Sequence, residues 1–160
     1  MLYYWFRTFE RGLAFMLLGQ NFRFGYYSYS PEERIAAIKK AGFDSVMFWW
    51  GNEFDSCDGT KEYRYELAVK AGLQVSTVHF PSTNAHFLWL NSDEGTCYVR
   101  EMVSAVHDCG RLHIKNLVMH TTRKFLTVPP NQTGLEHLQK VLTEAESEGV
   151  KIAIENTRFL

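Results

Sequence analysis

The chain has 160 residues, of which 46% are apolar and 22% are charged, and its formal net charge is −1. This composition is typical of one globular domain with a buried core. The near-neutral charge argues against a nucleic-acid partner or a membrane surface, because both require a basic face. The three cysteines form no CxxC pair, which argues against a disulfide framework and favours a reducing, cytoplasmic location.

Residues 1–20 differ from the rest of the chain in being strongly aromatic and apolar. The uninterrupted apolar stretch over residues 13–18 is too short to span a bilayer and short for the core of a signal peptide. We therefore expect an N-terminal extension over residues 1–20, followed by a single domain over residues 21–160.

Four glycines divide that domain into repeating units: Gly42, Gly72, Gly110 and Gly149. Each closes a helical pattern, where glycine supplies the left-handed backbone that ends a helix, and an apolar run follows. The pattern predicts strands over residues 21–27, 45–50, 73–79, 114–120 and 150–155. It predicts helices over residues 30–41, 61–71, 94–109 and 131–148.

The alternation of strand and helix predicts an α/β fold with parallel strands joined by right-handed crossovers. Two architectures fit, a doubly wound sheet and the first part of a (β/α)₈ barrel. The first turn reads GYYSYSPEE and lacks the glycine-rich phosphate loop of a dinucleotide fold, and no helix follows the last strand. Both features favour a partial (β/α)₈ TIM barrel with about five parallel strands and four helices, truncated after the fifth strand.

Three of the predicted strands end in residues that can bind a metal or move a proton: His79, His120 and Glu155. The carboxyl ends of the strands form the active face of such a barrel. Imidazole and carboxylate groups are common ligands of divalent metals and common acid–base groups. The alternative for each residue is a hydrogen bond or a salt bridge at the barrel rim, without any ligand.

Aromatic residues end or follow the first two predicted strands. Trp49 and Trp50 close the second strand, and Tyr26 lies at the end of the first. The rings could stack on a sugar and the tyrosine hydroxyl could donate to it, but large rings also simply fill the top of a barrel. Both interpretations remain open from the sequence.

Four segments together resemble the xylose isomerase-like TIM barrels, a superfamily of sugar phosphate isomerases and epimerases that also contains endonuclease IV. They are SPEERIAAIKKAGFDSVMFWW, AGLQVSTVHFPS, CGRLHIKNLVMH and GVKIAIEN, in this order and at barrel spacing. The resemblance implies a divalent metal (Mn, Mg, Zn or Co) that binds a small sugar or sugar phosphate. It also implies that Glu155 is a metal ligand and the catalytic acid–base residue. His79 and His120 would line the substrate pocket, as in the isomerases, or bind metal, as in endonuclease IV.

The resemblance leaves three functions open. The first is a metal-dependent isomerase or epimerase that transfers a proton next to a carbonyl. The second is an endonuclease IV-type phosphodiesterase, which the lack of a basic surface disfavours. The third is a catalytically silent partial barrel, because the ligands expected from strands six to eight are absent from this sequence. In that case a second copy of the chain or another partner would cover the open sheet edges.

Overall fold

A computed structural model of the protein describes residues 3–8, 14–24, 29–123 and 128–155. The chain forms two compact units, residues 1–77 and residues 78–160. No helix in the described ranges is both long enough and apolar enough to cross a bilayer.

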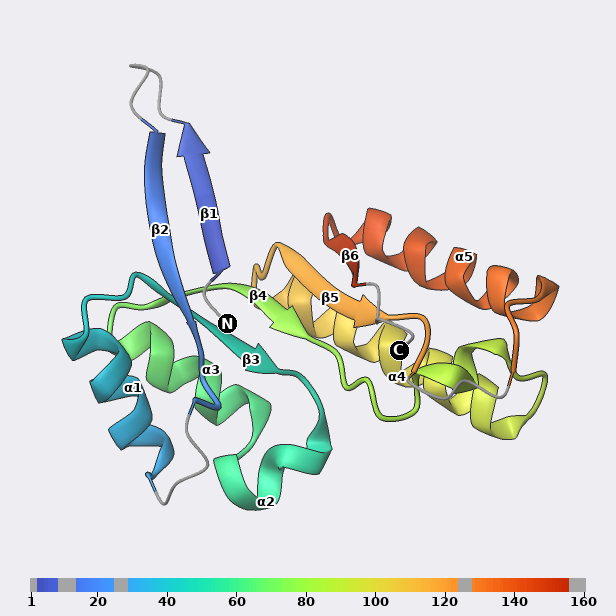
Figure 1. Ribbon diagram of the computed structural model, residues 1–160, viewed down its shortest axis with the longest axis horizontal. Coiled ribbons are helices and arrows are strands. Elements are labelled where there is room, and N and C mark those ends of the chain that lie inside the picture. The colour runs from blue at the N-terminus through green and yellow to red at the C-terminus, as the bar shows by residue number, and fades with distance from the viewer. Residues whose placement is uncertain (1–2, 9–13, 25–28, 124–127, 156–160) are drawn as a thin grey trace. The chain divides into compact units, whose positions relative to one another are not determined.

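The first unit contains two strands that run antiparallel to one another, followed by parallel strands and helices (Figure 1). Its elements are β1 (Tyr3–Thr8), β2 (Ala14–Asn21), α1 (Pro31–Lys40), β3 (Ser45–Trp49), the 3₁₀ helix η1 (Asn52–Phe54), α2 (Asp55–Asp58), α3 (Lys61–Lys70) and the beginning of β4 (Gln74–His79). β2 pairs in parallel with β3, and α1 lies beside α3. Apolar side chains from these elements form the core of the unit, among them Phe22, Ile35, Ile38, Val46, Phe48 and Ala68.

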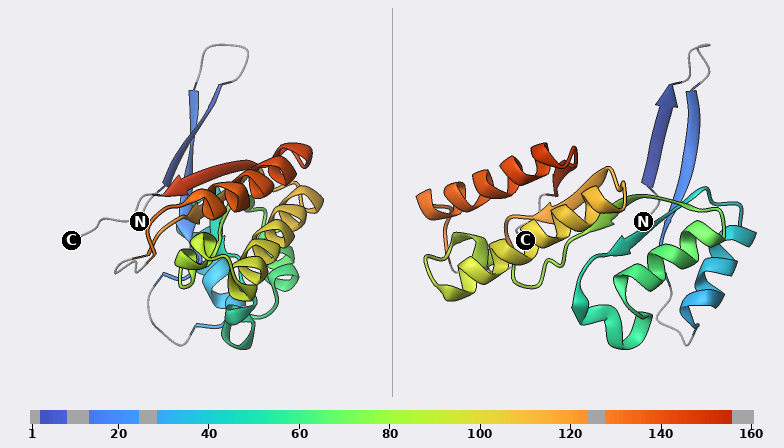
Figure 2. Two further views of the ribbon diagram at one scale, coloured as in Figure 1. Left: turned by 90° about the vertical axis from the view of Figure 1, so that its right-hand side faces the viewer. Right: turned by 180° about the vertical axis from the view of Figure 1, so that it is seen from behind.

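The second unit repeats the strand–helix alternation (Figure 2). Its elements are the end of β4, the 3₁₀ helix η2 (Ala85–Trp89), α4 (Asp93–Arg111), β5 (Asn116–His120), α5 (Gln132–Ser147) and β6 (Lys151–Glu155). The long helices α4 and α5 lie side by side, and β5 pairs in parallel with β6. Fully buried side chains of this core include Val78, Leu88, Met102, Val106, Leu117, Met119 and Val141.

Among the described residues, each α-helix except the short α2 begins where a side chain can accept a hydrogen bond from the first turn. The four residues that do so, each from the backbone N–H three positions later, are Ser30, Thr60, Ser92 and Asn131. Such caps satisfy amide groups that the helix itself leaves unpaired, typically for about 1 kcal/mol each. Helix starts are therefore fixed locally by the sequence, as the pattern at residues 30–33 predicts.

The strands follow one another in the sheet in chain order, from β1 to β6. β2 to β6 are parallel, and β1 is antiparallel to β2. In a doubly wound sheet the order of the strands reverses at a switch point, so neighbouring strands do not all follow one another in the sequence. In a (β/α)₈ barrel each strand lies next to the strand that follows it in the sequence. The order therefore confirms the predicted partial barrel. The described residues add β1, the short helix α2 and the 3₁₀ helices η1 and η2 to the expected elements.

The predicted first strand, over residues 21–27, was wrong. The strand is β2, which ends at Asn21, where the side-chain Oδ1 accepts a hydrogen bond from the backbone N–H of Arg23. This local turn, which asparagine forms readily, ends the strand before the aromatic residues that follow. The division of the chain into an extension over 1–20 and a domain over 21–160 stays a prediction, although β2 crosses it.

One of the four glycines does not end a helix in a left-handed conformation. Gly42, Gly72 and Gly149 have positive φ angles of 84°, 71° and 65°. Gly110 instead lies inside α4, and the left-handed residue is His113, with φ 56°. The carboxylate end of Glu148 packs against Gly110 and would have to move if a Cβ atom were added, so this glycine serves close packing rather than a turn.

A charged cluster around the buried Asp58 connects elements of the first unit. Asp58 is fully buried and accepts a hydrogen bond from Arg34 Nη1 at 2.8 Å, and its other oxygen lies 3.1 Å from Arg23 Nε. Arg64 is 1% exposed and lies 3.6 Å from Asp55. Arg34 lies on α1 and Arg64 on α3, both of which the sequence pattern predicts, whereas the two aspartates lie on α2. The cluster therefore links these three helices.

Candidate metal centre

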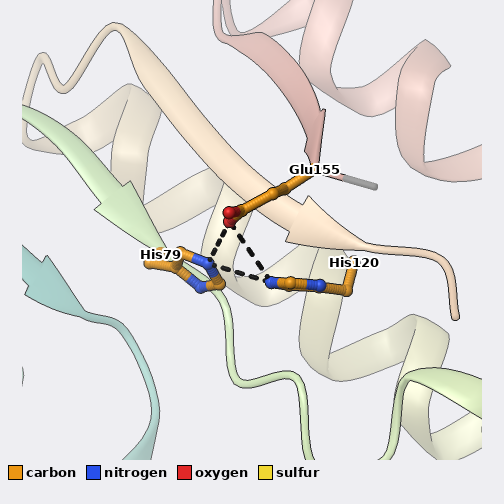
Figure 3. Close-up of side chains that lie close together, drawn as sticks. All are labelled: His79, His120 and Glu155. Atoms are coloured by element: carbon orange, nitrogen blue, oxygen red, sulfur yellow. Dashed lines mark hydrogen bonds and ion pairs between the residues drawn. The ribbon is translucent and has the colours of Figure 1, made fainter. Parts of the chain in front are cut away.

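Three polar side chains converge at the carboxyl ends of neighbouring strands in the second unit. His79 ends β4, His120 ends β5 and Glu155 ends β6. In the register of β5 and β6, His120 lies directly opposite Glu155. Figure 3 shows the two imidazole rings and the carboxylate pointing toward one another. The structure thus brings together the three residues that the sequence predicts as metal ligands.

The donor atoms of these residues form a nearly equilateral triangle. His79 Nε2 lies 3.2 Å from Glu155 Oε2 and 3.2 Å from His120 Nε2, and His120 Nε2 lies 3.4 Å from Glu155 Oε2 (Figure 3). A tetrahedral ion with ligands at about 2.0–2.1 Å separates its donors by roughly 3.3–3.4 Å. The three distances therefore match three ligands around one ion.

The hydrogen bond on the far side of the His79 ring determines where this residue carries its proton. His79 Nδ1 lies 2.7 Å from the backbone carbonyl oxygen of Phe80. A carbonyl oxygen can only accept, so Nδ1 carries the hydrogen, and in a neutral ring Nε2 presents a lone pair. That lone pair faces the Glu155 carboxylate, which is also an acceptor. Two acceptors at 3.2 Å repel each other, and a cation between them, either a proton or a metal ion, would relieve this repulsion. A backbone carbonyl behind a histidine is a common arrangement in metal sites.

His120 is suited to remain neutral. Burial and, to a smaller extent, the neighbouring His79 lower the pKa of His120, while Glu155 acts in the opposite direction. Its side chain is 11% exposed. Because only a neutral imidazole can bind a metal ion, the lowered pKa extends metal-binding competence toward acidic pH.

The alternation of side chains along β5 explains why the site lies on one face of the sheet. Leu117 and Met119 are fully buried, whereas Val118 and His120 on the opposite face are partly exposed. On β6, Val118 pairs with Ala153 two residues before the pair of His120 and Glu155, so the two pairs lie on the same face of the sheet. The period of two thus places both ligands on the face away from the buried core.

The segment that follows His79 is folded against the segment that follows His120. Trp89 of η2 donates from Nε1 to the carbonyl oxygen of Thr121 at 2.6 Å, and Arg123 Nη1 donates to the carbonyl oxygen of Thr83 at 2.6 Å. Trp89 is 6% exposed, so its ring is part of the core and not a free stacking surface. The sequence does not predict these two hydrogen bonds, because the bonded residues are more than 30 positions apart and no local sequence pattern indicates that they meet.

The aromatic residues predicted to bind substrate do not belong to this cluster of three. Trp49 is partly exposed, with its ring 6.1 Å from that of Phe54, and Trp50 is 1% exposed. Both lie in the first unit, and their role in substrate binding stays a prediction. Tyr26 lies outside the described residues.

Fold and site together define a barrel-type α/β protein with a candidate metal centre at the carboxyl ends of its strands. The sequence profile of the xylose isomerase-like TIM barrel family matches residues 35–159. The chain therefore belongs to this family. No curated protein matches the sequence significantly.

Solved structures of sugar epimerases are similar to this chain. A D-psicose 3-epimerase from Clostridium cellulolyticum H10, solved with D-tagatose, is 14% identical with a TM-score of 0.66, and the match covers 85% of this chain and 50% of the epimerase. An L-ribulose 3-epimerase is 16% identical with a TM-score of 0.65, covering 85% and 48%. A xylose isomerase domain protein from Planctomyces limnophilus is 12% identical with a TM-score of 0.59, covering 86% and 51%. At these identities the likeness establishes the fold, and the chain spans about half the length of these proteins.

Proposed function

We propose that this chain contributes to a metal-dependent isomerase or epimerase that acts on a small sugar or sugar phosphate. The observation that carries the proposal is the donor triangle of His79, His120 and Glu155 at the carboxyl ends of adjacent strands. In a protein of this family, that edge of the sheet is where chemistry is expected. The names of the similar structures, which include three kinds of sugar 3-epimerase, support the same substrate class.

The donor set fits a divalent ion, for which Mn, Mg, Zn and Co are the candidates. Two imidazoles with one carboxylate suit Zn and Co better than Mg, which prefers oxygen ligands. When bound, such an ion would polarise the sugar carbonyl and make the neighbouring C–H more acidic.

The protein's own groups would divide the remaining work. Glu155 turns Oε2 toward the two histidines, which leaves Oε1 as the oxygen that can take a proton from carbon. In an isomerisation Oε1 would return the proton to the neighbouring carbon, whereas an epimerisation needs a second acid on the opposite face of the sugar. The Phe80 carbonyl keeps the His79 lone pair directed into the site. His120, held neutral by its surroundings, adds no positive charge that would repel a cation.

The proposal is tested by following exchange of a carbon-bound sugar hydrogen with solvent deuterium. The protein as its source produces it is loaded with each candidate metal and incubated in deuterated water with a panel of ketoses and ketose phosphates. We expect deuterium at the carbon next to the carbonyl, detected by NMR, and loss of this exchange in Glu155→Gln. Glu144→Gln on α5 is the matched control, because Glu144 also faces a histidine Nε2, at 3.3 Å, outside the site. Exchange that is absent with every metal, or unchanged in Glu155→Gln, contradicts the proposal.

A second candidate is phosphodiester cleavage of the endonuclease IV type. The feature that favours it is the presence of two histidines in the triangle, since these residues match the zinc-binding histidines that the resemblance implies. The net charge of −1 counts against DNA binding. Cleavage of DNA at abasic sites, together with more than one zinc ion per chain, would favour this candidate over the first.

Location and assembly belong to the same proposal. All three cysteines, Cys57, Cys97 and Cys109, are free thiols, which supports a reducing compartment such as the cytoplasm. We propose a small sugar as the partner of the site and a second copy of the chain as the partner of the sheet edge. Sedimentation of the protein as its source produces it tests the second point.

A further inference from the structure

We propose that Trp89 is a positioning residue for the metal centre, which holds the backbone that follows His120. The proposal rests on the proposed function only in assuming that the donor triangle binds metal. Its argument comes from how the two histidines are held.

The two histidines are fixed in different ways. The His79 ring is anchored on its far side by the Phe80 carbonyl, 2.7 Å from Nδ1. The Nδ1 atom of His120 is buried and has no hydrogen-bond partner among the described residues. On the side of the ring away from the donor triangle, the orientation of His120 therefore depends on packing and on the position of its backbone.

Trp89 fixes that backbone immediately after His120. Its indole N–H donates to the carbonyl oxygen of Thr121 at 2.6 Å. The same tryptophan lies in the segment that follows His79, whose first residue is also paired with β5, through the bond from Phe80 N–H to the carbonyl of Val118 at 2.8 Å. The indole hydrogen bond thus ties the segment after one histidine to the segment after the other.

Trp89 can act as a rigid support because α5 holds it from two directions. Asn131 donates from Nδ2 to the Trp89 carbonyl oxygen at 2.8 Å, and its Oδ1 caps α5 by accepting from Gly134 N–H at 3.0 Å. The indole ring packs directly on Gly134, where any Cβ atom would overlap it. His137 further donates from Nδ1 to the carbonyl of Leu88 at 2.8 Å. The first turns of α5, Trp89 and the end of β5 therefore form one connected set of contacts.

The competing explanation is that Trp89 only contributes to core packing. The two explanations differ in what removal of the indole N–H does when the ring is kept. Trp89→Phe retains an aromatic ring over Gly134 but loses the bond to Thr121. Val141→Ala, at a fully buried position on α5, is the control for general loss of packing.

Two measurements on the full-length protein separate these explanations. The first is the mobility of the His120 ring in the metal-free protein, from NMR relaxation of ¹³C-labelled histidine. The second is the affinity for Co²⁺, measured by titration calorimetry at a temperature where every variant is folded. In Trp89→Phe we expect a more mobile His120 ring and an affinity lowered about tenfold, as is usual for groups that orient a ligand. In Val141→Ala we expect neither change.

The outcomes distinguish this proposal from the proposed function. An unchanged His120 ring in Trp89→Phe, or an equal change in Val141→Ala, overturns the positioning role whatever the metal titration gives. Absence of Co²⁺ binding by the unaltered protein, with a loosened ring in Trp89→Phe, overturns the metal centre and leaves the positioning role in place. Where Trp89→Phe does not fold, Asn131→Asp replaces it, because aspartate keeps the helix cap but cannot donate to the Trp89 carbonyl. We expect it to change both measurements in the same direction.

Discussion

Replacement of Glu155 by glutamine should have opposite effects on the metal-free and the metal-bound protein. Without metal, the carboxylate faces the His79 lone pair at 3.2 Å, an arrangement of two acceptors. A glutamine amide at the same position can donate a hydrogen bond to that lone pair. With metal, the same change removes the only anionic ligand of the triangle.

The expected magnitudes follow from the geometry. A new hydrogen bond contributes about 1 kcal/mol at most, and less here because Glu155 is 36% exposed. Metal at a free concentration of 100 times its dissociation constant stabilises the protein by about 2.7 kcal/mol. If the loss of the anionic ligand weakens binding about 100-fold, the same concentration stabilises the variant by only about 0.4 kcal/mol.

The assay is thermal and urea unfolding at pH 8, where an ordinary imidazole is neutral, with and without Zn²⁺. A stabilisation of about 2.7 kcal/mol corresponds to a midpoint shift of roughly 5–11 °C for a chain of this size. Glu144→Gln is again the control, because its carboxylate is 37% exposed and also faces a histidine. If Glu155→Gln destabilises the metal-free protein and keeps the metal-induced shift, the assignment of the His79 proton and of the ligand set is wrong.

Three further predictions concern stability and are measured by urea denaturation. The pKa of His120 is lowered by burial, so the unfolded chain takes up its proton at about pH 6.5 and the folded chain only at lower pH. The free energy of unfolding of the metal-free protein should therefore fall as pH drops below about 6.5, and His120→Gln should flatten this dependence. In a solvent-exposed helix, a Gly→Ala change stabilises by about 1 kcal/mol. Gly134→Ala should instead destabilise this protein, because the new Cβ atom overlaps the Trp89 ring. A gain in stability would refute the described packing. Asp58→Asn should lower the free energy of unfolding by about 3–5 kcal/mol, because it leaves the largely buried Arg34 guanidinium without its carboxylate partner. A decrease below about 1 kcal/mol would contradict a buried ion pair.

Much of the fold could be predicted because its signals are local. Cap residues, glycines at helix ends and apolar strands each act within a few positions, so the predicted helices and four of the five parallel strands agree with the structure to within one or two residues. The first strand was missed because a side-chain turn at Asn21 ended it earlier than the aromatic pattern suggested. Gly110 was misread because a packing glycine and a turn glycine are indistinguishable without the residue that packs on them, Glu148.

The sequence predicts which three residues form the candidate site, but not the hydrogen bonds that hold these residues in place. A polar residue at the end of an apolar strand can be recognised in the sequence, and adjacent parallel strands necessarily bring such ends together. The hydrogen bond from His79 to the carbonyl of Phe80 joins adjacent residues, but it depends on the orientation of the imidazole ring, which the sequence does not give. The hydrogen bond from Trp89 to Thr121 joins residues 32 positions apart, and it can form only when η2 packs against α5.

The coordination number of the bound ion separates the two candidate functions more directly than its identity. The triangle of His79, His120 and Glu155 provides three ligands. A four-coordinate ion would then have one open position, which suits a single water nucleophile for hydrolysis. A sugar that binds through two oxygens needs at least two open positions, and thus a five- or six-coordinate ion. Because four-coordinate Co²⁺ absorbs visible light far more strongly than six-coordinate Co²⁺, the spectrum of the Co²⁺ protein reports this number. We expect a weak spectrum that changes when a ketose is added, and an intense spectrum that no sugar alters would favour phosphodiester cleavage over sugar epimerisation.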